Sequence, residues 1–443
     1  MKTAAVIGAG LAGAEAAHAL AACGIHVRLF EMKPAKFSPA HKNENFAELV
    51  CSNSFKAFRE NSAPGMLKAE MRLLGSATLR AAERCTVPAG GALAVDRVAF
   101  SAEVTRQLRE NPLIEIVSGT ECDTFPEENT VIATGPLTSD VFACAIQAKI
   151  GDNFLHFFDA AAPVITAESI DREIALAASR YGKGDADYLN CPMSATQYDV
   201  FYHELINAET AVLHEFEKGD IYEGCMPVEV LAKRGKDSIR FGPLKPVGLT
   251  ETFEDRTGSR PAAIVQLRAE NDPPTMYNLV GFQTNLKFRE QERVFRLIPG
   301  LQDAEFVRYG VMHRNTFLNS PKLLTDNYRL KNSRNIFFAG QITGVEGYME
   351  SAGSGIVAGL ALAAAISGKE MPPLPKTTML GCLSDYAANF SGKDFQPMGA
   401  NMGLLPEITL SAGRRVAKQE KYRFLSERGL SDLREFISAY INR

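Results

Sequence analysis

The apolar and polar positions at the start of the chain follow the order of a strand, a turn, a helix and a second strand. Residues 3–7 are a short apolar run, residues 8–13 are rich in glycine, and an Ala-rich stretch of helical character follows. Gly24 ends this stretch, and a second apolar run, residues 25–30, stops at Glu31. This order predicts one βαβ unit with its glycine turn at the start of the helix.

The glycine turn has the spacing of a dinucleotide-binding loop, GxGxxG. Its glycines permit a tight turn and close approach of the backbone to a pyrophosphate, and the helix N-terminus supplies N–H groups. Glu31 stands 18 residues after Gly13, where a carboxylate can bind a ribose hydroxyl. Because both flanking elements and the acid are present, we prefer a dinucleotide site to a chance glycine turn. The expected contacts are Gly8, Gly10, Leu11, Ala12, Gly13 and Glu31.

Two later apolar runs also end in small residues. Residues 129–135 end in Ala-Thr-Gly, and residues 334–340 end in Ala-Gly and precede more glycines and an Ala/Leu-rich helix that reaches about Ile366. These segments are similar to the later fingerprints of flavoproteins that hold extended FAD, so FAD is favoured over NAD as the tightly held cofactor. The alternative is ordinary strand ends with packing glycines. The residues expected at the cofactor are Thr134, Gly135, Gly340, Gln341, Glu346, Gly347 and Gly355.

The segment between these runs has a different pattern, with turn signals at 190–192, 242–243, 245–246, 273–274 and 299–300. Alternating runs such as residues 263–268 indicate mixed strands. We therefore expect an α/β chain in which a Rossmann-like, two-dinucleotide-binding FAD domain is interrupted by an inserted mixed α/β domain. The expected divisions are 1–185 and 304–370 for the FAD domain, 186–303 for the insertion, and 371–443 for a mostly helical region packed on the insertion.

Composition and charge narrow the classes of function. The 443 residues are 46% hydrophobic and 23% charged, which excludes a disordered chain or a disulfide-built miniprotein. The net charge of −4 excludes a global basic field, so any nucleic-acid site must be local. The longest weakly polar stretch, 355–368, is too short for a bilayer, so we expect no membrane partner. Eight scattered cysteines without zinc spacing predict no metal site and a reducing, cytoplasmic setting.

Two cysteines stand in contexts that suit chemistry. Cys225 precedes Pro227 and a predicted helix, whose positive end would make its thiolate easier to form. Cys51 lies where an apolar run gives way to Ser-Asn-Ser, soon after the first βαβ unit. A buried packing role is the alternative for both residues, and Cys191, which precedes Pro192, is not separated from Cys225 by this reasoning.

Two polar clusters could line a pocket. Residues 311–319 and 344–351 combine an imidazole, a guanidinium, amides and a phenol, which together can bind a pterin-like ring. His313 could equally be a satisfied core histidine. The candidate substrate contacts are His313, Arg314, Asn315 and Tyr348.

With these segments in hand, the chain closely resembles the folate-dependent tRNA uracil-5 methyltransferases, the FAD-containing family called TrmFO, along nearly its whole length. The motifs that carry the resemblance are GAGLAG at 8–13, FAELVCSNS at 46–54, VPAGGALAVDR at 87–97, ATGPLTS at 133–139, GCMP at 224–227, YGVMHRNT at 309–316 and GVEGY at 344–348. The related GidA-like tRNA-modifying flavoproteins share the glycine motif but are longer.

The resemblance implies transfer of a one-carbon unit from 5,10-methylenetetrahydrofolate to C5 of the T-loop uridine of tRNA, with FAD reduced by NAD(P)H. Uracil C5 is a poor nucleophile until a thiolate adds at C6, so the reaction needs an activated cysteine and a base. Cys225 matches the family's nucleophile and Cys51 its proposed general acid/base. His313 and Tyr348 fall in family segments that border the flavin and the folate.

Other targets stay open at this point. A paralogous group with the same fold methylates ribosomal RNA, and a non-catalytic flavin-binding subunit that positions RNA for a partner enzyme is a third reading. Basic residues at 233–240 and in the C-terminal tail could form a local phosphate-binding track, or could be plain solvated helix surface. The carbon could pass directly from folate or through the flavin, and the oligomeric state is likewise open.

Overall fold

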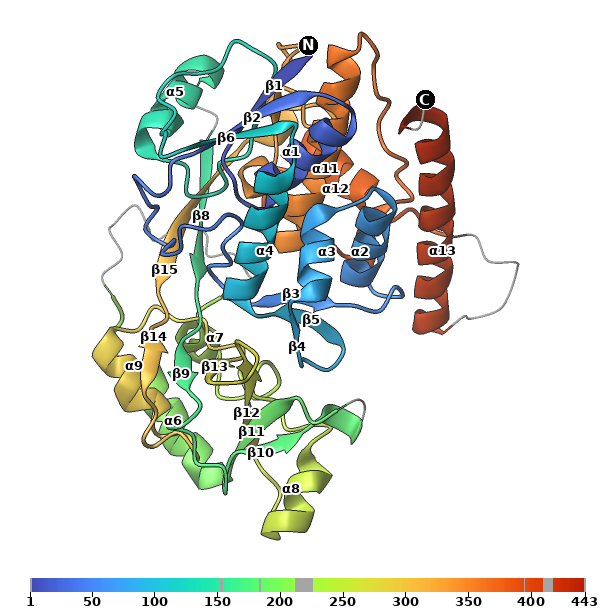
Figure 1. Cartoon of the computed structure of the whole chain (residues 1–443). Coiled ribbons are helices and arrows are strands. Elements are labelled where there is room, and N and C mark those ends of the chain that lie inside the picture. The colour runs from blue at the N-terminus through green and yellow to red at the C-terminus, as the bar shows by residue number, and fades with distance from the viewer. Residues whose placement is uncertain are drawn as a thin grey trace.

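The chain folds into two units joined by a pair of long strands (Figure 1). The computed structural model describes residues 2–151, 154–182, 185–211, 226–393, 395–408 and 417–441, with the backbone alone for 155–160, 256–257 and 313–314.

The first unit is built on a parallel five-stranded sheet in the order β16-β7-β1-β2-β6. Its strands are β1 (Thr3–Ile7), β2 (His26–Glu31), β6 (Ile114–Ser118), β7 (Thr130–Ile132) and β16 (Ile336–Phe338). The predicted βαβ unit is confirmed, because α1 (Leu11–Ala22) connects β1 to its parallel neighbour β2. The two later apolar runs form β7 and β16, which pair with each other although they lie more than 200 residues apart in the chain, and β7 also pairs with β1.

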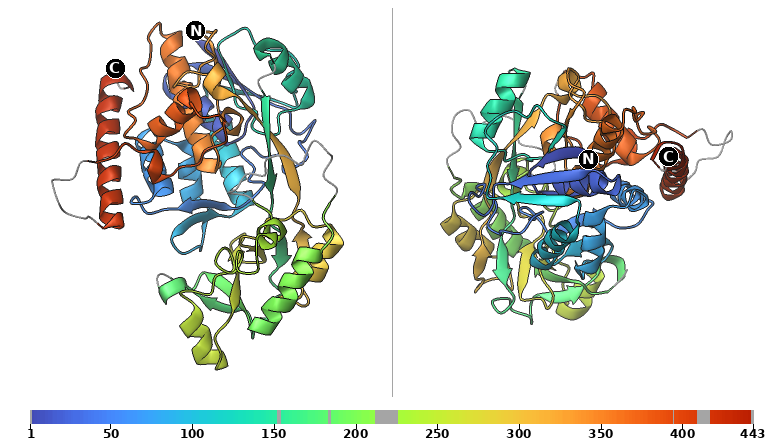
Figure 2. Two further views of the ribbon diagram at one scale, coloured as in Figure 1. Left: turned by 180° about the vertical axis from the view of Figure 1, so that it is seen from behind. Right: turned by 45° about the horizontal axis from the view of Figure 1, so that its top comes forward.

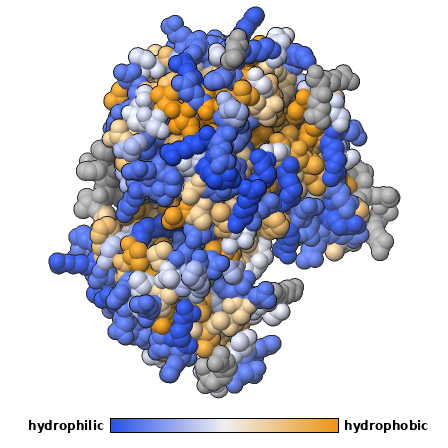
Figure 3. All heavy atoms as spheres, in the orientation of Figure 1, coloured by the Kyte–Doolittle hydropathy of each residue, from blue (hydrophilic) through white to orange (hydrophobic). Residues whose placement is uncertain are grey.

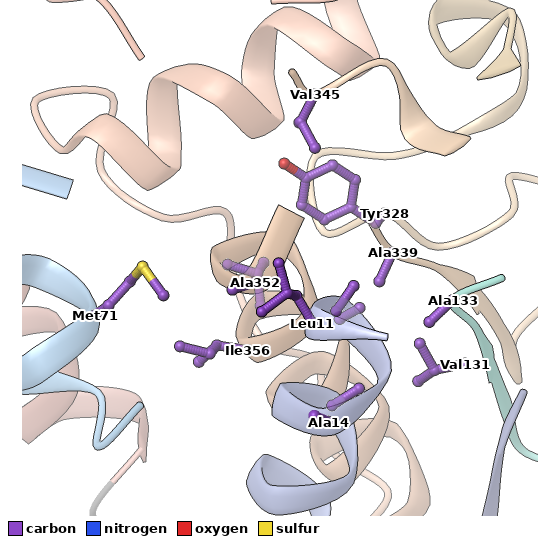
Figure 4. Close-up of a cluster of buried hydrophobic side chains, with 14 of the residues drawn as sticks. Leu11, Ala14, Met71, Val131, Ala133, Tyr328, Ala339, Val345, Ala352 and Ile356 are labelled. Carbon is purple, nitrogen blue, oxygen red and sulfur yellow. The ribbon is translucent and has the colours of Figure 1, made fainter. Parts of the chain in front are cut away.

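Two helices form the centre of this unit. α1 packs along α11 (Tyr348–Ile366), and their backbones approach so closely that a Cβ at Gly355 would lie 2.1 Å from the Ala12 carbonyl oxygen. Figure 4 shows Leu11 of α1 next to Ala352 and Ile356 of α11. α11 is long and apolar enough to cross a membrane, but most of it is buried inside the protein.

On the face of the molecule in Figure 3, apolar side chains are interspersed among hydrophilic ones.

Further helices and a small antiparallel sheet complete the first unit. The helices are α2 (Ala63–Leu73), α3 (Ala77–Arg84), α4 (Arg97–Glu110), α5 (Asp140–Ile150) and α10 (Ser320–Leu323), and the small sheet is β3 (Ser54–Ala57), β5 (Ala92–Val95) and β4 (Thr86–Val87). Polar side chains fix where the helices begin: Ser62, Ser76 and Asp96 accept backbone N–H groups of α2, α3 and α4.

The second unit is a six-stranded sheet in the order β10-β11-β12-β13-β9-β14, in which the neighbouring strands are antiparallel. Its strands are β9 (Val164–Thr166), β10 (Leu176–Ala178), β11 (Tyr188–Met193), β12 (Ala263–Ala269), β13 (Met276–Leu279) and β14 (Phe306–Arg308), and its helices are α6 (Ala195–Asn207), α7 (Val228–Lys233), α8 (Thr250–Thr257) and α9 (Phe288–Phe295). β9, β10 and β14 lie outside residues 186–303, so the observed unit is wider at both ends than the expected insertion.

Two strands run between the units. β8 (Phe154–Ala160) pairs antiparallel with β15 (Met312–Leu318) along its whole length, from Phe154 opposite Leu318 to Ala160 opposite Met312. Figure 1 shows this ribbon leading from the upper unit to the lower one. The chain therefore enters and leaves the second unit side by side.

One turn prediction was wrong. Residues 190–192 lie inside β11, where Cys191 pairs with Val265 and Pro192 with Ile264 of β12. The neighbouring β10 reaches only as far as Asn190, so Pro192 needs no ladder partner on that side. A proline is tolerated where a strand has such an open edge.

The C-terminal region packs on the first unit, not on the insertion as expected. α12 (Met379–Asn389) begins at α2, where the buried Glu70 carboxylate accepts the backbone N–H groups of Met379 at 2.7 Å and Leu380 at 2.9 Å. α13 (Lys418–Phe436) also contacts α2, and the Ser426 hydroxyl donates to the Glu60 carbonyl oxygen at 2.7 Å. Figure 2 shows α13 beside the first unit.

Candidate functional site

A pocket lies at the carboxyl ends of the parallel strands. It is lined by the residues that follow β1, β2, β7 and β16. In open parallel sheets this edge is where ligands bind, because helix N-termini and loops face it. The pocket collects predicted cofactor contacts from four separate segments: Gly8, Gly10, Leu11, Ala12, Glu31, Thr134, Gly135, Gly340 and Gln341.

The glycine loop after β1 fits a pyrophosphate. Gly8 has φ of +96°, and a Cβ there would lie 2.7 Å from the Ala133 carbonyl oxygen. A Cβ at Gly13 would lie 1.7 Å from the Gly8 carbonyl oxygen, so Gly13 serves close packing of α1 on the loop. Gly10 is different, since a Cβ there would meet no atom within 4 Å. No side chain caps α1 at Gly10, so its first turn presents backbone N–H groups at the pocket.

Glu31 occupies the position expected of a ribose ligand. Its carboxylate accepts the backbone N–H groups of Ala9 and Lys33, both at 3.0 Å, and its side chain is almost fully buried at the pocket wall. Two backbone donors hold the carboxylate in place beside the glycine loop. The acid, the open Gly10 position and the uncapped helix together fit the adenosine and pyrophosphate parts of FAD.

The prediction for Gly355 was wrong. This glycine was expected to contact the cofactor, but it lies between α11 and α1, where its missing side chain allows the two backbones to meet. It does not line the pocket. The glycine serves the packing that positions α1, because a Cβ there would collide with Ala12.

A second pocket adjoins the first. Both pockets are lined by Val50, Pro136, Leu137, Gln341 and Tyr348. The second pocket adds Cys51, Asn315, Glu346 and Gly347 from the predicted site. Glu346 accepts a hydrogen bond from the side-chain amide of Gln341. This bond connects a residue of the second pocket to a residue that lines both pockets. Glu346 and Gly347 therefore lie beside the second pocket and not at the dinucleotide end of the first.

Tyr348 fixes the loop that carries Cys51. Its hydroxyl accepts the backbone N–H groups of Cys51 at 2.8 Å and Ser52 at 3.1 Å. Its ring packs edge-on against Phe55 with centroids 5.8 Å apart. Burial raises the pKa of this phenol, with the Cys51 thiol adding to the effect. Tyr348 thus stays neutral. From its position at the start of α11 it holds the Cys51 backbone in place.

The remaining predicted substrate residues lie on β15 or outside the described structure. Asn315 is buried and lines the second pocket. His313 and Arg314 precede it on β15, opposite Asp159 and Phe158, and only their backbone is described. Cys225 lies outside the described residues.

The chain that follows Cys225 is attached to the wall of the second pocket. The described chain resumes at Met226, and the backbone N–H of Val228 donates to the Gln283 carbonyl oxygen at 2.7 Å. Gln283 lines the second pocket. Pro227 precedes α7 as predicted.

Cys191 is separated from the other candidates by its burial. It lies fully buried in β11, and burial raises the pKa of its thiol to about 12. A thiol in this state supplies almost no thiolate near neutral pH. Cys191 is therefore a packing residue. In the described part of the chain no three His, Cys, Asp or Glu side chains are grouped so as to hold a metal ion.

The sequence analysis missed three arginines around the Cys51 loop. The Arg97 guanidinium donates to the Leu49 carbonyl oxygen at 2.7 Å, and Arg308 donates to the Val50 carbonyl oxygen at 3.5 Å. Arg268 donates to the Ser52 hydroxyl at 2.9 Å and to the Asn53 side-chain oxygen at 2.8 Å. Arg268 had a visible signal, because it stands in the apolar run of β12 where a charge is unusual. Arg97 is the last residue of the 87–97 motif, which did not indicate this contact, and Arg308 had no local signal.

Part of the predicted basic track is already paired. The Lys236 ammonium lies 2.5 Å from an Asp199 carboxylate oxygen, and Arg240 lies 3.1 Å from Asp237. Exposed pairs of this kind contribute little to stability and exchange readily. A phosphate-binding role for residues 233–240 stays a prediction.

Comparison with known proteins gives a consistent result. The family model described as "Glucose inhibited division protein A" matches residues 3–370. A protein of Acetivibrio thermocellus named methylenetetrahydrofolate–tRNA-(uracil-5-)-methyltransferase TrmFO is 55% identical over 436 residues, which cover 98% of each chain. Proteins with the same name from Desulfitobacterium hafniense and Halalkalibacterium halodurans are 55% and 52% identical, again with 98% of each chain covered.

Among solved structures, GidA of Aquifex aeolicus has a similar fold. In its form I crystal the TM-score is 0.67 at 17% identity, and the match covers 98% of this chain and 76% of the GidA chain. At this identity the likeness shows the fold alone. It supports the Rossmann-like flavoprotein architecture that the sequence predicts.

Proposed function

The chain belongs to the TrmFO family, and from this premise we propose that it transfers a one-carbon unit from 5,10-methylenetetrahydrofolate to C5 of uridine 54 in the T-loop of tRNA. The family and the enzyme class follow from full-length relatives at 52–55% identity. The T-arm as the recognised part of the tRNA, NAD(P)H as the reductant and a cytoplasmic location belong to the proposal.

The first pocket has the residues that would hold FAD. The N–H groups at the start of α1 would bind the pyrophosphate, Glu31 the ribose, and Thr134 and Gly340 the part that approaches the second pocket. When bound, FAD supplies the two electrons that convert a transferred methylene into a methyl group, and NAD(P)H restores them. The second pocket adjoins this site and would receive the pyrimidine and the folate.

The chain's own residues would supply a nucleophile and a base. By its match to the family motif, the Cys225 thiolate would add to C6 of uracil and raise the electron density at C5, which would bond to the methylene carbon as one bond of that carbon to its donor nitrogen opens. Cys51 would then remove the C5 proton, and the C5–H electron pair would form an exocyclic double bond to the methylene carbon as its remaining bond to the donor breaks and the donor leaves. A hydride, which reduced FAD would supply, would convert this methylene into a methyl group while the C5–C6 double bond re-forms and the Cys225 sulfur leaves. Tyr348 keeps the Cys51 backbone in place throughout.

A single observation supports this assignment above the others: Tyr348 and Gln341 line both pockets, and Tyr348 binds the backbone of Cys51. A reactive sulfur beside a flavin site, and open to a second pocket, is what methylene transfer with reduction requires.

Cysteine variants of the full-length, FAD-loaded protein test the proposed roles. Unmodified tRNA is incubated with 5,10-methylenetetrahydrofolate and NADPH, and 5-methyluridine is measured by mass spectrometry. We expect Cys225→Ala and Cys51→Ala each to lose at least about 100-fold in rate, the size of effect seen for removal of nucleophiles and bases. Cys144→Ala, at an exposed cysteine of α5, is the control and should retain the full rate.

Full activity of either variant would remove that cysteine from the mechanism. Activity of the wild-type protein on a ribosomal RNA fragment and not on tRNA would assign it to the ribosomal paralogues.

A further inference from the structure

The arginines around the Cys51 loop form one cluster drawn from three elements. Arg97 stands at the start of α4 in the first unit, Arg268 near the end of β12, and Arg308 at the end of β14 in the second unit. We call Arg97, Arg268 and Arg308, together with Glu270, the arginine cluster. Its guanidinium groups bind four of the five residues from Leu49 to Asn53. The residue of this loop that they leave for other contacts is Cys51.

The charges of this cluster do not balance. Glu270 makes a two-point ion pair with Arg97, one contact of which is 3.2 Å long. Among the described residues, Glu270 is the carboxylate that forms an ion pair with this cluster, and its partner is Arg97. Arg268 and Arg308 bond neutral oxygens of the loop instead. Burial of unbalanced positive charge is costly, so the site favours an additional negative group.

Arg308 has unsatisfied hydrogen-bond donors within the described structure. Its Nε and Nη2 atoms are fully buried and have no hydrogen-bond partner among the described residues. Burial lowers the pKa of its guanidinium to about 10, with Arg97 adding to the effect. An unsatisfied buried donor costs about 1–3 kcal/mol, and a charged donor costs more. A role limited to joining the two units would be served by a neutral side chain without this cost.

Two nearby groups can become negative, the Tyr348 phenol and the Cys51 thiol, and both interact electrostatically with the guanidinium groups of Arg97 and Arg308. Burial raises the pKa of the Tyr348 phenol and keeps it neutral, which leaves the Cys51 thiol. This thiol is partly exposed and lines the second pocket. The charged and titratable groups that surround it are Arg97, Arg268, Glu270 and Arg308 of the cluster, and Tyr348, Lys56, Glu346 and Glu350 at the second pocket.

We infer that Arg97 and Arg308 hold Cys51 as a thiolate in the resting protein, with Arg308 as the positioning residue that supplies its second positive partner. A cysteine beside fixed guanidinium groups gains a stable thiolate because the anion satisfies charges that are already buried. This deepens the proposed function and rests on it for its consequence. The thiolate is then ready to take the C5 proton: an S–H bond forms, the C5–H bond breaks, and the electron pair forms an exocyclic double bond to the methylene carbon as the bond from that carbon to its donor breaks.

The pH dependence of Cys51 alkylation tests this inference without any turnover. Full-length, FAD-loaded protein is treated with iodoacetamide between pH 5 and 10, and the Cys51 peptide is quantified by mass spectrometry. We expect the wild-type midpoint to lie below about 8.5, the ordinary value for a cysteine. A wild-type midpoint at or above that value overturns the inference, and this outcome needs no variant.

Variants of Arg308 show whether its charge is responsible. Arg308→Gln should raise the midpoint by at least about one pH unit, and Arg308→Lys, which keeps a positive charge, should raise it less. Arg296→Gln is the matched control, because Arg296 bonds a backbone carbonyl oxygen in the same unit, that of Ala304. An unchanged midpoint in an Arg308→Gln protein that still binds FAD and melts normally would contradict the inference.

The outcome is distinguishable from failure of the proposed function. The wild-type protein could show a low alkylation midpoint that rises in Arg308→Gln and yet form no 5-methyluridine. This result would support the Cys51 thiolate and reject the methyl-transfer role. If the wild-type protein transfers the methyl group but its Cys51 alkylation midpoint is ordinary, the proposed function is supported and the Cys51 thiolate is rejected.

Discussion

Gly8 and Gly10 stand two residues apart in the loop after β1, and the structure places different constraints on them. Gly8 adopts a backbone conformation that L-residues rarely reach, and its neighbour across the loop is the Ala133 backbone. Gly10 has an ordinary conformation and open space beside it, at the wall of the first pocket. The motif predicts both glycines, but only the structure separates a folding role from a binding role.

Alanine at each position should therefore have a different effect. We expect Gly8→Ala to destabilise the protein by about 1–3 kcal/mol through strain at positive φ. Gly10→Ala should melt like the wild type but bind FAD about tenfold more weakly, since its methyl group projects into the pyrophosphate site. Thermal melting and titration of the apoprotein with FAD, followed by flavin absorbance, measure the two effects. Equal FAD affinity for Gly10→Ala and the wild type would argue against this loop as the pyrophosphate site.

The candidate site was predictable where the signal was local. The contacts of the glycine loop, Glu31 and Tyr348 follow from short motifs, and the structure brings these residues to adjoining pockets. The arginine cluster was not predictable, because Arg97, Arg268 and Arg308 meet only through the docking of two units. Burial, which separates Cys191 from other cysteines, is likewise a property of the folded sheet.

At the scale of elements, the contact between α1 and α11 sets the position of the pyrophosphate site. Gly355 and Gly359 of α11 face the Ala12 and Ala16 carbonyl oxygens of α1, at 2.1 and 2.9 Å from an added Cβ. Small residues along both helices let the backbones approach to this degree. The N-terminus of α1 is thereby held under the loop that follows β1.

A larger side chain in this contact should push α1 away from the sheet. We expect Gly355→Val to lower the stability by about 2–3 kcal/mol, as overpacking does, and to reduce FAD retention at the same time. Ala365→Val, at a half-buried position near the end of the same helix, introduces the same β-branched side chain at a less buried position and is the control. Differential scanning fluorimetry with flavin content measures both. A Gly355→Val protein as stable as Ala365→Val would show that the helices are not in close contact.

His18 on α1 gives the stability a pH dependence. Burial lowers its pKa from 6.5 to about 4, with Arg80 adding to the effect. Between these values the unfolded chain binds a proton that the native state excludes, so stability falls as the pH falls from 6.5 toward 4. When the pH is lowered from 7.5 to 5, the free energy of unfolding should fall in both proteins. We expect it to fall by about 1–2 kcal/mol less in His18→Asn than in the wild type.

Urea unfolding at the two pH values measures this difference. His203→Asn, at an exposed histidine of α6, is the control and should follow the wild type. A His18→Asn variant that loses stability in acid as steeply as the wild type would show that His18 is solvated in the native protein.

Elements with a strong local period were predicted well, and long-range pairing was not. β1, α1, β2, β7, β16 and α11 follow from apolar runs and glycine breaks close in sequence. β9 and β14 join the second sheet through partners far along the chain, so the insertion was predicted too narrow. The docking of α12 depends on Glu70, a buried carboxylate at the helix N-terminus that is 309 residues from Met379.

At the scale of the molecule, the second pocket lies where the two units meet. The first unit contributes the first pocket, Cys51 and Tyr348, and the second contributes Gln283, Arg268 and Arg308. The β8–β15 ribbon carries the chain between them and presents Asn315 to the second pocket. This arrangement brings together groups that neither unit holds alone.

Isotope transfer tests the central claim of methylene transfer with reduction most directly. The FAD-loaded protein is incubated with 13C-labelled 5,10-methylenetetrahydrofolate, NADPH and an unmodified tRNA transcript, and the tRNA is digested and mapped by mass spectrometry. We expect one labelled methyl group at C5 of uridine 54, and none in a transcript with cytidine at that position. Unlabelled tRNA, with a flavin that NADPH reduces normally, would contradict the account.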